Sequence, residues 1–309
     1  MRFPLAPAVF TLACLACGNP TPRRSGTVLF ASGADLQSMN PLITIHPLAK
    51  QVQRYVLLMT LVRYDSLLEV EPYLARSWEW SGDRRTVTMF LSPEARWHDG
   101  TPTTARDAAW TLNAARDPVT GYPRQQEMAE IDSAFAIDDT TLMIRFRTGQ
   151  DRIPDVLTDL AVAPSSRLDS VPRARMREAP WNRNPVGNGP FRFVSHETNR
   201  RWVFVADSTF PAELGGPPSI DRLVIAIVDE PTTKLAALTA GELDFAGINP
   251  AHASFVRDNP DLRVVDYPLI FTYGIILNTR QPPFDDYRVR QAVNIALDRR
   301  EIVNGYLYG

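Results

Sequence analysis

Alternating apolar and polar residues predict a β-hairpin early in the chain. Trp78 and Trp80 alternate with polar neighbours on the first arm, and a second alternating arm follows at residues 86–91. This period of two is typical of strands that bury one face. Between the arms, residues 81–83 (Ser-Gly-Asp) are small and polar and tolerate a positive φ in a tight connection. The hairpin alone is a fold element and indicates no function.

The rest of the pattern predicts further strands that alternate with helices. A second hairpin, with its turn at residues 138–140, is expected to extend the sheet of the first. Strands are expected at residues 27–31, 134–137, 142–146, 191–195, 220–228, 244–246 and 273–279, and helices at 48–61 and 232–243, after Thr104, after Asp286 and after Asp298. This alternation favours a mixed α/β fold.

The hairpin is followed by a motif that carries more information. A Trp-His-Asp-Gly-Thr-Pro turn at residues 97–102 leads into a helix start, with Thr104 as the expected N-cap. The whole run from residue 74 to residue 112 resembles the signature of the family 5 extracellular solute-binding proteins, the receptors of ABC importers for peptides, nickel and oligosaccharides. The chain departs from the family pattern at Ser92 and Glu94, where the family usually carries Arg and Gly.

Two later landmarks resemble the same family in the same order. Residues 186–191 (VGNGPF) resemble the family's VGTGPF, with Asn188 in place of Thr, and residues 282–299 resemble its PPF-DD-x-RVRQAV-x-x-ALDR run. The glycines at 187 and 189 do not indicate a phosphate loop, because no Lys-Ser/Thr follows and the next element is a strand.

The resemblance implies a two-lobed fold of the type II periplasmic-binding-protein class and an organisation to match. The expected parts are a lobe I core from residues 27–50 and 186–268, an inserted β-rich subdomain at 51–185, and a crossover with the start of lobe II at 269–309. Family members continue well beyond the position of Gly309. A chain with one lobe and a stub is therefore expected to be truncated and to bind solute weakly or not at all, since closure needs both lobes.

Family ligand sites draw on the end of the first strand, on the crossover strands and chiefly on the second lobe. The resemblance therefore implies Gly33, Ala34 and Asp35 as ligand-binding candidates at the first strand, and Tyr273 and Asn278 near the crossover. Local packing or hinge geometry is the competing interpretation for each of them. For Asp35 in particular, capping of the turn competes with a ligand contact.

The amino terminus has the pattern of an export signal. Residues 1–17 combine an early Arg2, an apolar run too short to span a bilayer, and Cys17 as the expected lipobox cysteine, with Cys14 as the competing site. Residues 18–26 then form a short tether. A plain secretory peptide with incidental cysteines is the alternative. These features and the resemblance imply an extracytoplasmic monomer, anchored to the membrane by lipid and partnered with the permease subunits of an importer.

Charge and composition exclude several other classes. The net charge is −2 with interspersed signs, which does not favour nucleic acid as a partner. Both cysteines lie in the signal segment, and the four histidines have no metal-ligand spacing, so no metal or cofactor is expected. The only lysines, Lys50 and Lys234, stand among many arginines, which is interpreted as genomic composition.

The sequence therefore predicts a solute-binding protein and no enzyme. Peptides are the default solute, followed by nickel chelates, oligosaccharides and opines. Two alternatives stay open: a truncated, non-binding lipoprotein that serves as an interaction module, and an exported hydrolase. Against the hydrolase, the chain has no G-x-S-x-G elbow and no H-E-x-x-H motif.

Overall fold

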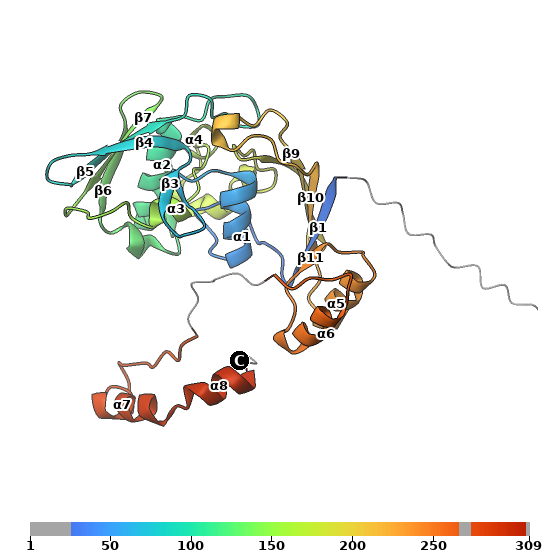
Figure 1. Ribbon diagram of the computed structural model, residues 1–309. Coiled ribbons are helices and arrows are strands. Elements are labelled where there is room, and N and C mark those ends of the chain that lie inside the picture. Colours follow the sequence, from blue (N-terminus) through green and yellow to red (C-terminus); the bar gives the residue numbers. More distant parts are fainter. Residues whose placement is uncertain (1–25, 266–272, 307–309) are drawn as a thin grey trace, which may run out of the picture.

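The computed structural model describes residues 26–265 and 273–306. A five-stranded sheet, a four-stranded sheet and a small two-stranded sheet make up the body, with helices packed between and around them (Figure 1). The expected signal segment, with Cys14 and Cys17, and nearly all of the expected tether lie outside the described residues. In the part of the chain that is described, no helix is both long and apolar enough to cross a bilayer.

The first sheet is mixed and brings distant parts of the chain together. Its five strands are β1 (Thr27–Ser32), β8 (Phe191–Glu197), β9 (Arg201–Ala206), β10 (Arg222–Ile227) and β11 (Phe245–Ala246). They run in the order β11-β1-β10-β9-β8, with β1 parallel to both β10 and β11 and with antiparallel pairing from β10 to β8. Helix α5 (Pro231–Thr239) connects β10 to β11 across β1. The mixed α/β class expected from the sequence is confirmed.

The second sheet contains both predicted hairpins. Its strands are β4 (Ala75–Trp80), β5 (Thr86–Leu91), β6 (Ile131–Ala136) and β7 (Thr141–Phe146), in the antiparallel order β4-β5-β7-β6. The second hairpin extends the sheet of the first, as predicted. The positive φ of the first turn falls on Arg84 (φ 55°) and not on residues 81–83. Arg84 is held there by hydrogen bonds that its guanidinium donates to the carbonyls of Gln150 (2.5 Å) and Asp151 (2.6 Å).

The remaining elements are mostly short. They are α1 (Pro47–Val52), the π-helix η1 (Gln53–Leu57), β2 (Val62–Tyr64), β3 (Val70–Pro72), α2 (Ala105–Arg116), η2 (Pro118–Thr120), η3 (Gln125–Met128), α3 (Val156–Asp159), α4 (Ser165–Leu168), η4 (Arg173–Glu178), η5 (Pro180–Asn182), η6 (Ala212–Leu214), η7 (Pro250–His252), α6 (Ala253–Asp258), α7 (Tyr287–Ala296) and α8 (Arg299–Tyr306). Two of the predicted elements were wrong. The helix expected over 48–61 ends at Leu57, and the strand expected over 273–279 does not form.

The two glycines of the VGNGP turn explain where that early helix ends. The amides of Asn188 and Gly189 donate to the carbonyl of Leu57, at 3.1 and 2.9 Å. A Cβ on Gly187 would lie 2.0 Å from the same oxygen, so only glycine admits this approach. Asn188 completes the contact, because its side-chain oxygen accepts from the amide of Met59 (3.0 Å).

The HDGTP turn is fastened to the VGNGP turn. The backbone amide of His98 donates to the carbonyl of Gly187 (2.7 Å), and its ring Nε2 contacts the carbonyl of Gly189 (2.8 Å). Burial lowers the pKa of His98, which favours a neutral ring there. These two sequence landmarks therefore act together as scaffold.

Asp107 joins the start of α2 to its surroundings. Its buried carboxylate accepts from the indole of Trp97 (3.1 Å), from the amide of Thr104 (3.0 Å) and from the amide and hydroxyl of Ser165 (2.9 and 2.6 Å). Thr104 is the N-cap of α2, as predicted. The carboxylate of Asp107, at the third position of the helix, accepts from the Thr104 amide and so caps the helix start.

One continuous apolar core underlies both sheets. It includes Trp202 and Phe204 of β9 together with Met89 of β5 and Ala108 of α2. By contrast, α7 and α8 contribute no buried residue, and Figure 1 shows them (red) standing apart from the sheets. The body can therefore be stable without them, since burial of apolar surface is the main driving force of folding.

Candidate functional site

The carboxyl ends of three parallel strands meet at one edge of the first sheet. Ser32 pairs in register with Ile227, and Ala31 with Ala246, so β1, β10 and β11 end next to one another. In open α/β sheets, ligands bind outside the carboxyl ends of the strands. The residues that follow the strands are Gly33 to Asp35, Val228 to Glu230 and Gly247 to Asn249.

The segment after β1 is shaped by Ser32. Its buried hydroxyl donates to the carbonyl of Ala34 (2.6 Å) and accepts from the amide of Ala34 (3.3 Å). The Ser32 carbonyl accepts from the amide of Val228 (2.8 Å), which extends the pairing with β10 by one step. Gly33 is half-buried and Ala34 is exposed, so both residues of this turn are accessible to solvent.

Asp35 faces inward and is fully engaged. Its carboxylate accepts from the indole of Trp202 (2.7 Å) and the amide of Asn199 (2.8 Å), and it lies 2.9 Å from Nε2 of His196. Burial alone would raise the pKa of Asp35, but these hydrogen bonds outweigh burial and lower it. The imidazole of His196 also stacks on Trp202, with ring centroids 3.8 Å apart. Asp35 therefore fixes the loop after β1 to β8 and β9.

Two charged side chains beside Gly33 were not among the predicted site residues. A Cβ on Gly33 would lie 3.2 Å from Nζ of Lys234 and 3.9 Å from Oδ1 of Asp229. Lys234 lies in the first turn of α5. Glu230 caps the N-terminal end of this helix, because its carboxylate accepts from the amides of Thr232 (3.0 Å) and Thr233 (2.5 Å). The hydrogen bond from the Thr232 hydroxyl, together with these two amide bonds and the bond from the Thr233 hydroxyl, lowers the pKa of Glu230 to about 2. The scarcity of lysine was the sequence signal that could have singled out Lys234.

The two crossover candidates lie in a different setting. Tyr273 is 65% exposed, and its ring meets that of Tyr306 edge-on at 6.4 Å between centroids. The side-chain oxygen of Asn278 accepts from the amide of Arg280 (3.1 Å), which makes it a turn residue. In Figure 1 the stretch that begins at residue 273 leads into α7.

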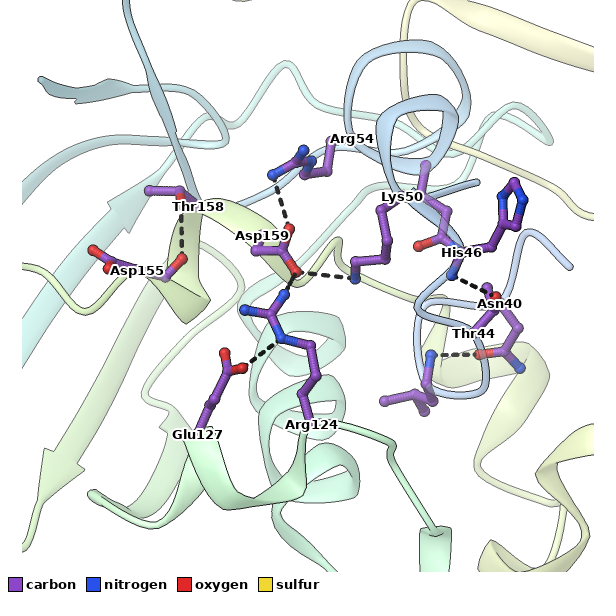
Figure 2. A network of polar contacts seen from close by, with 12 residues as sticks. Asn40, Thr44, His46, Lys50, Arg54, Arg124, Glu127, Asp155, Thr158 and Asp159 are labelled. Carbon is purple, nitrogen blue, oxygen red and sulfur yellow. Dashed lines mark hydrogen bonds and ion pairs between the residues drawn. The ribbon is translucent and has the colours of Figure 1, made fainter. Parts of the chain in front are cut away.

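A second polar cluster surrounds Asp159 at the end of α3. Figure 2 shows three cations directed at this one carboxylate: Lys50 at 3.3 Å, Arg54 at 2.8 Å and Arg124. Arg124 also pairs with Glu127 (2.5 Å). Burial lowers the pKa of Lys50, and the charge of Asp159 offsets part of that effect. The cluster ties α1 and η1 to α3 and to the start of η3.

Two concave regions lie elsewhere in the described part of the chain. An open apolar groove with a volume of about 500 Å³ runs between α5 and α6, where Leu235 and Phe255 line it. A smaller pocket of about 80 Å³ is lined by Arg63, Arg76 and Glu213 among others. Among residues 26–265 and 273–306, no three His, Cys, Asp or Glu side chains are grouped so that they could hold a metal ion.

Comparison with known proteins supplies the family. The profile of the bacterial extracellular solute-binding proteins, family 5 Middle, matches residues 69–309. A putative ABC transporter peptide-binding protein of Brucella ovis is 32% identical over 251 residues, which is 81% of this chain and 47% of that protein. Heme-binding protein A of Haemophilus influenzae is 30% identical, over 78% of this chain and 47% of its own length. The chain thus spans about half the length of the curated relatives it matches.

Solved structures show the same fold. The oligopeptide-binding protein AppA of Bacillus subtilis, in complex with a nonapeptide, superposes with a TM-score of 0.79 at 22% identity, over 90% of this chain and 55% of that one. The type II periplasmic-binding-protein class expected from the sequence is therefore confirmed for this part of the fold. By its sequence profile and its fold, the chain belongs to the family 5 bacterial extracellular solute-binding proteins.

Proposed function

We propose that this chain belongs to the extracytoplasmic solute-binding component of an ABC importer, and that peptides are its solutes. The observation that carries the proposal is the edge where β1, β10 and β11 end. This edge combines the solvent-accessible residues Gly33 and Ala34 with the ammonium of Lys234, which has no ion-pair partner among residues 26–265 and 273–306. Peptides offer backbone amides, carbonyls and charged ends that such an edge can bind. The relatives named for peptide binding support this choice of solute.

In the proposed mechanism, the solute binds between two lobes and the closed form delivers it to the permease subunits. Residues 27–50 and 186–268 are the proposed core of the first lobe, 51–185 an insertion into it, and 269–309 the crossover with the start of the second lobe. Gly33 and Ala34 are proposed to contact solute through their backbone, and Tyr273 and Asn278 to do so after closure. Asp35 is proposed to hold the loop in place, since its carboxylate is already engaged.

The remaining proposals concern the cell envelope. The protein is proposed to be exported by its first 17 residues, to be anchored through lipid on Cys17, with Cys14 as the alternative, and to act as a monomer. Labelling cells with a radioactive fatty acid tests the anchor. Label on the wild-type protein that persists in C14S and disappears in C17S is expected, whereas label lost only in C14S would assign the other cysteine.

Solute uptake tests the function itself. Cells that lack the gene are expected to take up a labelled tripeptide more slowly than wild-type cells, and a plasmid copy is expected to restore the rate. Labelled glutathione, haem and a nickel–histidine chelate serve as matched solutes. Loss of uptake for one of these with unchanged peptide uptake would overturn the choice of peptides, and unchanged uptake of all four would overturn the function.

A further inference from the structure

Lysine is the rare cation of this chain. Of 33 basic residues only Lys50 and Lys234 are lysines. Lys50 is 5% exposed and is paired with Asp159 at 3.3 Å. The ammonium of Lys234, in contrast, has no hydrogen-bond or ion-pair partner among residues 26–265 and 273–306. The ion pair with Asp159 explains why a lysine is buried at position 50. No contact in the described structure explains the lysine at position 234.

The stability of α5 does not explain Lys234. A cation in the first turn lies at the positive end of the helix dipole, which is the unfavourable end. Glu230, four residues earlier, is the usual kind of partner for a lysine on a helix. Its oxygens, however, accept from the amides and hydroxyls of Thr232 and Thr233, and they form no ion pair with Lys234. The helix end is therefore satisfied without the lysine.

The position of Lys234 points to the strand ends instead. Its Nζ would lie 3.2 Å from a Cβ on Gly33, so the absence of a side chain there leaves room for the ammonium over the end of β1. Asp229 approaches the same point, with its Oδ1 3.9 Å from that Cβ position, and yet no ion pair forms between the two. An unpaired cation thus lies where a fold of this class receives its ligand.

We propose that the ammonium of Lys234 binds a carboxylate of the solute at the carboxyl end of β1. This inference rests on the proposed solute-binding function and specifies one of its contacts. A lysine acts as a compact point charge on a flexible stem, which suits a single carboxylate whose position varies from solute to solute. Asp229 repels the same carboxylate and so weakens the net attraction that the ammonium exerts on it.

Lysine-specific NMR tests the proposal on the full 309-residue chain. Reductive methylation with ¹³C-formaldehyde labels lysine amines and keeps their charge. The Lys234 signal is assigned by its loss in K234Q. Tri-alanine, its C-terminal amide and inorganic phosphate are titrated separately to on the order of 10 mM, at matched ionic strength, because exposed ion pairs are weak.

The expected result is a saturable shift of the Lys234 signal with tri-alanine and a dissociation constant about fivefold weaker for the amide. In K234Q the preference for the acid over the amide, measured from backbone amide shifts, is expected to vanish. In D229N it is expected to increase. Equal binding of acid and amide by the wild-type chain would overturn the carboxylate contact, as would an equal saturable shift with phosphate or no saturable shift at all.

The outcomes separate this inference from the proposed function. Equal binding of both peptides, together with gene-dependent peptide uptake by cells, would remove the role of Lys234 and leave the function standing. Uptake of peptides that does not depend on the gene would remove the function. K234R is the matched variant for charge: retention of the acid preference in K234R and its loss in K234Q would show that charge, and not packing, carries the contact.

Discussion

Asp35 illustrates what a single residue can and cannot reveal in a sequence. Its position after the first strand marked it as a ligand contact or a turn cap. Its actual partners, His196, Asn199 and Trp202, follow more than 160 positions later in the chain. No local pattern connects residues so far apart. The same holds for Asp107 and Ser165, whose contact became visible only in the fold.

D35N is expected to lower the free energy of unfolding by about 2 kcal/mol at neutral pH, because the charge-assisted hydrogen bonds weaken. Since the folded state lowers the pKa of Asp35, its contribution is present above about pH 3.8, the ordinary value, and is lost as the pH falls through the folded pKa. Urea unfolding from neutral to acidic pH measures this. D151N, at an exposed aspartate, is the control, and an equal effect of both variants would contradict the assignment.

At the scale of elements, the sequence predicted the strands and helices that have strong local patterns. Both hairpins and the caps at Asp286 and Asp298 were found, because alternation and capping are local signals. The early helix was predicted too long, since its end is set by a turn 130 residues away at Gly187 and Gly189. The strand expected at 273–279 has an apolar sequence and no pairing partner in the described chain, and a strand needs a neighbour.

The glycine turn gives a direct prediction. G187A is expected to destabilise the protein by about 3 kcal/mol, because the new Cβ would lie 2.0 Å from the carbonyl of Leu57 and the end of η1 must shift. G82A, in the hairpin turn, is the matched control, since a Cβ there meets nothing within 4 Å. Urea midpoints compare the two. A G187A midpoint equal to that of G82A would show that the turn does not contact η1 as described.

At the scale of the molecule, the body and the last described helices differ in how they are held. The core is continuous from β1 to β10, whereas α7 and α8 bury no residue. Apolar side chains in this part are open to solvent, with Ile276 97% exposed and Ile295 75% exposed. Backbone with few buried contacts opens at low free-energy cost.

Limited trypsin digestion of the full chain is therefore expected to cut within residues 273–306 before it cuts within 26–265. The arginines at 280, 288 and 300 are exposed and supply the cleavage sites. Mass spectrometry locates the first cuts, and a thermal melt of the resulting body fragment is expected to match that of the intact chain. First cuts within the body, or a lowered melting temperature of the fragment, would contradict this division.

Photo-crosslinking tests the central claim, that solute binds at the strand ends, most directly. A tripeptide with a photoreactive side chain is added to envelope preparations, and the mixture is irradiated. Mass spectrometry then maps the residues that the peptide has modified. The predicted sites lie at 33–35, 228–234 and 247–249, and excess unlabelled peptide should abolish them. Crosslinks that still form in the presence of excess unlabelled peptide, or that map to the groove between α5 and α6 instead, would contradict binding at the strand ends.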